Sequence, residues 1–181
     1  MQTHKCGGVC IFIQNNIYYT TINMDRYSNE KDIEICAVKL HISCTIIIVT
    51  VYRSPTGNID YFLNNLEEAL NHIYNNTVDI ILCGDFNINC LNDNQDKQAL
   101  NPVLTSYSLY SIIDFPTRIY NNSQTMIDNI FINKFKNENY SVSPRSTAYP
   151  TMMLKFLAYS ILLLQMILMN FIRIEKLINT H

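Results

Sequence analysis

The sequence predicts an α/β domain in which a sheet is covered by helices. Apolar and β-branched runs that are typical of strands lie on both sides of a segment with helical periodicity. The chain has 181 residues, about the length of one domain. Of these residues 48% are hydrophobic and 15% are charged, which excludes an intrinsically disordered chain. Strands before and after a helix predict a layered α/β architecture.

Each element follows from a local pattern. Residues 33–40 and 45–52 alternate or are rich in β-branched side chains, so we expect two neighbouring antiparallel strands joined by a turn at 41–43. An amphipathic helix is predicted over 59–74, where apolar residues recur at helical spacing (Phe62, Leu66, Ala69, Leu70 and Ile73). The other expected elements are strands near 8–13, 78–83, 110–114 and 129–132 and a helix near 98–107.

Charge and cysteine usage restrict the class of protein. The formal net charge of −2 excludes a basic field over the whole protein, so any phosphate binding must be local. The six cysteines include no Cys-x-x-Cys pair, and several lie in apolar runs, so we expect buried, reduced thiols. No apolar leader segment follows Met1, and we therefore expect an intracellular protein, nuclear or cytoplasmic.

The C-terminal stretch 156–174 has a different composition. It is almost uncharged and strongly apolar, and about twenty apolar residues are enough to cross a bilayer. One interpretation is therefore a membrane-anchored, non-catalytic α/β domain with a C-terminal transmembrane segment.

The strongest chemical signal is the Gly-Asp-Phe-Asn segment at residues 84–87, which follows a buried strand. In extended backbone Asp85 and Asn87 leave the same face and Phe86 points into the core. A carboxylate can orient water or hold a divalent cation, and a carboxamide can donate to a phosphoryl oxygen. The alternative is an ordinary turn, since Gly, Asp and Asn favour turns.

Further motifs surround this segment in a defined order. In order and spacing they resemble the endonuclease/exonuclease/phosphatase superfamily, and in particular the endonuclease domain of jockey-like non-LTR (LINE-type) retrotransposons. The resemblance covers residues 7–139. Its motifs are Gly-Gly-Val-x-Ile-Phe-Ile, Tyr52-Arg53-Ser54-Pro55, the helix 59–74, Gly-Asp-Phe-Asn, Pro116-Thr117-Arg118 and Ile-Asp-x-Ile-Phe at 127–131.

The resemblance implies a DNase-I-like fold, a two-sheet sandwich flanked by helices, here truncated at the N-terminus and altered at the C-terminus. It also implies Mg²⁺- or Mn²⁺-assisted hydrolysis of a DNA phosphodiester, with a reverse transcriptase domain on the same chain in full-length relatives. The catalytic residues carried over are Asp85 (water and a weak metal ligand), Asn87 (phosphoryl oxygen), Tyr52 (scissile phosphate) and Asp128 (the metal–phosphate region). The substrate-binding residues carried over are Arg53, Thr117, Arg118 and Thr125.

Two parts of the family pattern have no counterpart in the sequence. We find neither the early strands that carry an Asn and the main metal-ligand Glu nor the later Ser-Asp-His triplet. If the codons for residues 148–155 are translated in the frame that starts at their third bases, the genetic code permits Leu-Ser-Asp-His-Asp-Ala-Gln. This peptide contains the missing triplet. We therefore expect a partial domain over 1–140 with little activity, and a non-homologous tail over 141–181. From residue 149 onward this tail is interpreted as an out-of-frame translation, and this interpretation is preferred to a membrane anchor.

Overall fold

The computed structural model describes residues 9–41, 45–121 and 123–133, together with the backbone of three further strands at 140–143, 155–158 and 172–174. Its centre is a six-stranded mixed sheet with the order β2-β3-β4-β5-β9-β6. These strands are β2 (Tyr19–Ile22), β3 (Ile33–His41), β4 (Thr45–Arg53), β5 (Asp79–Asp85), β9 (Asp128–Ile132) and β6 (Tyr110–Ser111).

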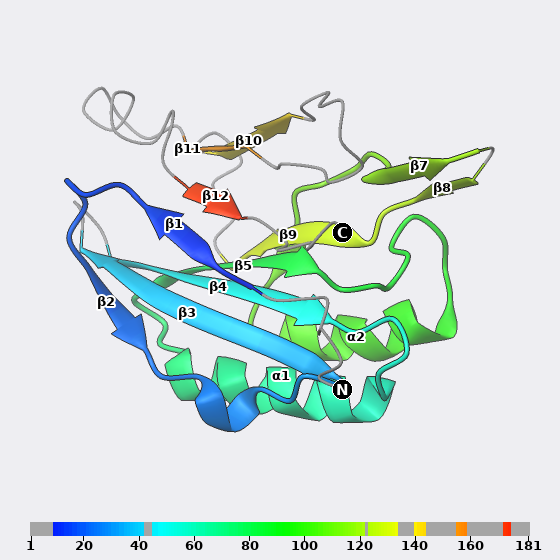
Figure 1. Cartoon of the computed structure of the whole chain (residues 1–181), viewed down its shortest axis with the longest axis horizontal. Coiled ribbons are helices and arrows are strands. Elements are labelled where there is room, and N and C mark those ends of the chain that lie inside the picture. Colours follow the sequence, from blue (N-terminus) through cyan, green and yellow to red (C-terminus); the bar gives the residue numbers. More distant parts are fainter. Residues whose placement is uncertain are drawn as a thin grey trace, which may run out of the picture.

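Two helices cover one face of this sheet (Figure 1). They are α1 (Ile59–Ile73) and α2 (Gln95–Ser106), and a short 3-10 helix, η1 (Asp25–Tyr27), precedes β3. The side chains of Asn58 and Asn94 accept hydrogen bonds from backbone N–H groups in the first turns of α1 and α2, at 2.9 Å each. These bonds satisfy donors that a helix start leaves without an intrahelical partner, so they fix where both helices begin.

The other face of the sheet carries a second layer of short strands (Figure 1). Strand β1 (Ile11–Ile13) pairs antiparallel with β12 (Ile172–Ile174), and β10 (Tyr140–Ser143) pairs antiparallel with β11 (Lys155–Ala158). A hairpin of β7 (Arg118–Tyr120) and β8 (Ser123–Thr125) completes the described strands. The predicted DNase-I-like arrangement, sheet on sheet with helices outside, is confirmed.

The core lies on both sides of the central sheet. Between the sheet and the helices, Phe62, Leu66 and Leu82 belong to one cluster of buried side chains and are fully inaccessible to solvent. On the opposite face, Ile48 and Ile130 belong to a second cluster, against which the β1 residues Ile11 and Ile13 pack. Successive residues of a strand point to opposite faces of the sheet. Since both faces of the central strands are buried, their odd-numbered and even-numbered residues are both apolar, and the sequence shows continuous apolar runs.

Most of the predicted elements are confirmed. The two long strands, the helix near 59–74 and the strand near 129–132 lie within a residue or two of their predicted bounds. Helix α2 begins three residues earlier than predicted, because its first turn is polar and is defined by the Asn94 cap. The predicted strand 110–114 is shorter, since only Tyr110 and Ser111 pair with β9. The predicted turn at 41–43 falls mainly outside the described residues, which resume at Thr45.

The apolar tail is described only at its two ends. Residues 155–158 and 172–174 are strands, and residues 159–171 lie outside the described part of the chain. Within the described residues, no helix has the length and apolar character that crossing a bilayer would need. Most of the chain after residue 133 lies outside the described residues, and the domain boundary near residue 140 and the out-of-frame translation of the tail stay predictions.

Four cysteines lie in the described residues, Cys10, Cys36, Cys83 and Cys90, and none of them forms a disulfide. Desolvation by burial, with a smaller contribution from neighbouring Cys10, raises the pKa of Cys36 to about 11. Complete burial raises the pKa of Cys83 further still. Both groups are therefore neutral thiols near neutral pH, and the thiol form is the poorer nucleophile.

We expect Cys36 to be alkylated slowly in the folded chain. A pKa raised from 9.0 to about 11 lowers the thiolate fraction at pH 7.5 by about 100-fold relative to an ordinary cysteine. The measurement is the rate of iodoacetamide labelling at each cysteine, read by peptide mass spectrometry with and without denaturant. Labelling of Cys36 in the folded chain at the denatured rate would contradict this assignment.

Candidate active site

Three predicted catalytic residues lie in one row across the central sheet. In the register of the strands, Tyr52 on β4 lies beside Asp85 on β5, and Asp85 lies opposite Asp128 on β9. Residues in register on adjacent strands project to the same face about 5 Å apart. The row continues to β3, where Glu34 lies opposite Tyr52. The sheet thus brings a phenol and the two predicted carboxylates together where β4 and β5 end.

Gly84 permits the close approach of β4 and β5 at this row. Its φ of +143° lies in a region that L side chains rarely adopt, and a Cβ built on it would lie 1.9 Å from the carbonyl oxygen of Val51. Only a residue without a side chain fits between these backbones. The glycine of the Gly-Asp-Phe-Asn motif is therefore required by the packing of the strand that presents Asp85.

Phe86 anchors the turn that follows Asp85. Its side chain is fully buried, and its ring packs edge-to-face against Phe62 at 6.2 Å and Phe131 at 5.2 Å between centroids. Its backbone N–H donates to the carbonyl oxygen of Ile127 at 2.8 Å. The prediction that Phe86 points into the core is confirmed, and the contacts join the turn to β9.

The reasoning that placed Asn87 beside Asp85 in extended backbone is wrong. Strand β5 ends at Asp85, and Asn87 has a φ of +48°, in the left-handed region. The backbone N–H of Asn87 donates to a carboxylate oxygen of Asp85 at 3.1 Å, which is a turn contact. The Asn87 carboxamide donates to the carbonyl oxygen of Arg53 at 2.6 Å. Asn87 is thus held at the end of β4 by a turn that periodicity does not reveal.

Thr117 holds the backbone at Asp128 through hydrogen bonds. The threonine is 8% exposed, and its hydroxyl accepts hydrogen bonds from the backbone N–H groups of Ile127 and Asp128, both at 3.1 Å. The contact of Thr117 with the substrate backbone stays a prediction. The hydroxyl holds the start of β9, the strand that presents Asp128.

Arg53, the last residue of β4, is buried against two turns. Its side chain is 5% exposed, and its guanidinium donates to the carbonyl oxygens of Asn87 and Gly57, at 3.2 Å in each case. Both described hydrogen bonds of the guanidinium are therefore made to the protein's own backbone. The contact of Arg53 with substrate stays a prediction.

The hairpin β7–β8 carries the other two predicted substrate contacts. Arg118 lies opposite Thr125 in the pairing of the two strands, and Arg118 is exposed. The next residues, Ile119 and Tyr120, are 67% and 69% exposed. Because Thr125 is only three residues from Asp128, the base of this hairpin lies next to the row of catalytic candidates. It presents a cation and two apolar side chains beside that row.

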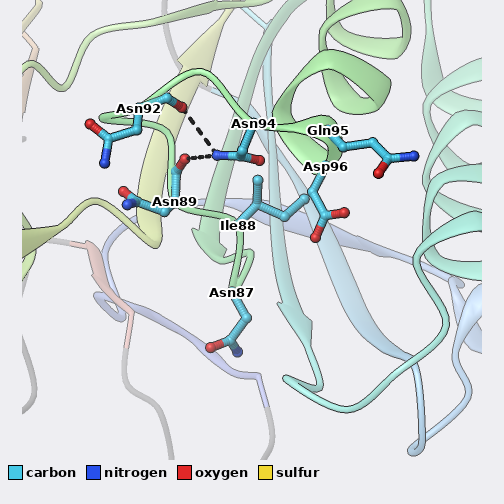
Figure 2. Close-up of a pocket in the computed structure, with 7 residues that line it drawn as sticks. All are labelled: Asn87, Ile88, Asn89, Asn92, Asn94, Gln95 and Asp96. Carbon is cyan, nitrogen blue, oxygen red and sulfur yellow. Dashed lines mark hydrogen bonds between the residues drawn. The ribbon is translucent and has the colours of Figure 1, made fainter.

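A polar hollow of about 490 Å³ adjoins Asn87 (Figure 2). The hollow is lined by the loop after Asn87 and the first residues of α2, and Asn94 donates to the carbonyl oxygens of Asn89 and Asn92 at 2.6 and 3.1 Å. The side-chain oxygen of Asn89 accepts from the N–H of Met126 at 3.0 Å. Sequence reasoning missed Asn89 and Asn94, and the two Asn-x-Asn pairs at 87–89 and 92–94 were the available signal.

The family follows from comparison of the sequence with protein-family models. Residues 46–149 match the model described as endonuclease-reverse transcriptase, more than half of the chain. The chain belongs to this family. No curated protein matches the sequence.

Solved structures of the superfamily share the fold. The endonuclease domain of TRAS1, a telomere-specific non-LTR retrotransposon, superposes with a TM-score of 0.66 at 15% identity, over 83% of this chain and 78% of that domain. A 3′ phosphatase from Neisseria, solved with a product DNA hairpin, gives 0.53 at 12% identity, over 82% and 72%. An AP endonuclease from Archaeoglobus fulgidus gives 0.53 at 9% identity, over 96% and 80%. At such low identity these structures show the fold alone.

Nucleases of this family and its superfamily generally depend on a divalent metal. In the described part of the chain, no group of three or more acidic, histidine or cysteine side chains is arranged to hold an ion. Asp85 and Asp128 supply two carboxylates on neighbouring strands, and hard cations such as Mg²⁺ usually take more oxygen ligands than two side chains give. Among the described residues, these two carboxylates are the candidate ligands for such an ion.

Proposed function

We propose that the chain is part of a Mg²⁺-dependent DNA endonuclease of a non-LTR retrotransposon. The family and the fold establish a nuclease-like domain of the endonuclease/exonuclease/phosphatase superfamily. The proposal of a DNA endonuclease rests on one observation: Tyr52, Asp85 and Asp128 lie in register on three adjacent strands. Asn87 lies in the turn after Asp85. These are the positions that the resemblance assigns to chemistry on a phosphodiester.

Each side chain has a role that its chemistry allows. The Asp85 carboxylate orients the attacking water, and the Tyr52 phenol donates a hydrogen bond to a phosphate oxygen. One N–H of the Asn87 carboxamide is engaged with Arg53, which leaves its second N–H for a phosphoryl oxygen. Asp128 supports the same region from β9, and a divalent cation bound there would stabilise the charge that develops on the phosphate.

We further propose that this chain cleaves DNA poorly. The sequence contains no Ser-Asp-His triplet, which supplies the acid/base histidine in the resembling family. Loss of a general acid/base group typically lowers a rate by two to four powers of ten, about 10²–10⁴-fold. In this proposal residues 1–140 are the partial endonuclease domain of an intracellular protein, and the tail from about residue 149 is translated out of frame. A reverse transcriptase domain would belong to the intact element.

The exposed hairpin gives a test on the chain as it exists. We expect Arg118→Glu to weaken the binding of duplex DNA about equally for all sequences and to lower the slope of log affinity against log salt by about one or more, since one phosphate contact is lost. Fluorescence anisotropy of a labelled duplex at several salt concentrations measures both quantities.

Arg26→Glu is the matched control for charge. Arg26 is an exposed arginine in η1, next to the helices. The two variants have the same net charge, so a general electrostatic effect would weaken DNA binding equally in both. Equal weakening, or no salt-dependent binding by the parent chain, would contradict DNA docking at the β7–β8 hairpin.

A further inference from the structure

The buried guanidinium of Arg53 connects two turns at one end of the sheet. Nη1 donates to the carbonyl oxygen of Asn87 and Nη2 to the carbonyl oxygen of Gly57, both at 3.2 Å. The guanidinium carbon also lies 6.0 Å from the centre of the Phe62 ring. A planar fork can reach two carbonyls in fixed directions at once, whereas the single ammonium of lysine cannot reproduce that geometry.

A second contact runs in the opposite direction. The Asn87 carboxamide donates through Nδ2 to the carbonyl oxygen of Arg53 at 2.6 Å. The backbone and the side chain of Asn87 are therefore both bonded to the same arginine. Asn87 has a φ of +48°, in the left-handed region that asparagine adopts more readily than most other non-glycine residues when its side chain bonds locally, as it does here to Arg53.

From this reciprocal pairing we infer that Arg53 is a positioning residue, which fixes the carboxamide of Asn87 so that its second N–H faces the phosphodiester. The inference rests on the proposed role of Asn87. Arg53 does not touch the substrate in this scheme. It acts through Asn87, because the guanidinium sets the path of the backbone and the Arg53 carbonyl sets the rotation of the amide group.

The test observes the Asn87 side-chain amide directly, in the full chain. Its ¹⁵N NMR signal is assigned by its loss in Asn87→Asp. In the parent chain we expect the amide hydrogen that bonds to the Arg53 carbonyl to exchange with water at least about tenfold more slowly than the amide hydrogens of the exposed Asn92 side chain. If the amide hydrogens of Asn87 all exchange with water as fast as those of Asn92, the inference is overturned without any arginine variant.

Arg53→Lys keeps the charge and removes the fork. We expect the Asn87 amide signal to move and its exchange to rise about tenfold, to that of Asn92, while Arg26→Lys leaves both unchanged. An unchanged Asn87 signal in folded Arg53→Lys would overturn the inference, and if this variant does not fold, the comparison within the parent chain decides.

Addition of a short duplex DNA separates the inference from the function on which it rests. We expect the duplex to shift the Asn87 amide signal of the parent chain and to shift it less in Arg53→Lys at the same concentration. A duplex that moves no Asn87 signal in the parent chain would defeat the proposed function, whereas the exchange rates would still report whether Arg53 holds the carboxamide. A shift of equal size in both chains would contradict the positioning role.

Discussion

Replacement of Gly84 by alanine is expected to destabilise the fold by about 3 kcal/mol or more, the sum of backbone strain and overpacking. The added Cβ would lie 1.9 Å from the Val51 carbonyl oxygen, and the φ of +143° is unfavourable for any L side chain. The strands can accommodate the methyl group only by separating, and this would also displace Asp85 from Tyr52. Thermal unfolding followed by circular dichroism measures the effect.

Ser123→Ala is a suitable control for Gly84→Ala, since Ser123 is exposed on β8 and its change adds nothing to a packed region. A surface change of this kind is expected to alter stability by less than about 0.5 kcal/mol. A melting temperature for Gly84→Ala within error of the parent chain would contradict the close approach of β4 and β5.

Phe86→Ala is expected to cost about 3–5 kcal/mol, because truncation of a fully buried phenylalanine removes transfer free energy and leaves a cavity. The ring joins Phe62 on α1 to Phe131 on β9, at edge-to-face distances of 6.2 and 5.2 Å. The substitution therefore loosens the core directly beneath the turn that carries Asn87. Denaturant unfolding at equilibrium gives the change in free energy of unfolding.

Phe86→Leu separates volume from aromatic geometry. Leucine fills most of the space, so we expect a loss of about 1.5 kcal/mol for this variant. Equal losses for the alanine and leucine variants would indicate that the cavity is not the cause. A loss below about 1 kcal/mol for Phe86→Ala would contradict the burial of the ring between α1 and β9.

The fold was largely predictable because its signals are periodic. The spacing of Phe62, Leu66 and Leu70 describes the buried side of α1, and the β-branched run of β4 describes a strand buried on both faces. Alternation also predicted correctly that Phe86 turns into the core. Such patterns are local, so a single sequence is enough to show them.

The site was less predictable because its contacts join distant segments. Periodicity cannot show that β5 ends at Asp85 or that Asn87 adopts a positive φ. A charged residue at a strand end is ordinarily solvated, and the burial of Arg53 depends on a carbonyl 34 residues away. The Thr117 hydroxyl is likewise occupied by N–H groups at the start of β9. Arg118 is the one predicted substrate-binding cation that the structure leaves exposed.

The most direct test is plasmid nicking in Mg²⁺ by two purified chains. One is the chain of 181 residues. The other is rebuilt from the genomic nucleotide sequence: the codons after Thr147 are translated in the neighbouring frame, and the coding sequence upstream of Met1 is included. We expect nicking only by the rebuilt chain, and loss of that nicking on Asp85→Ala. Equal nicking by both chains, a neighbouring frame without Ser-Asp-His, or full nicking by the Asp85→Ala variant would contradict the account.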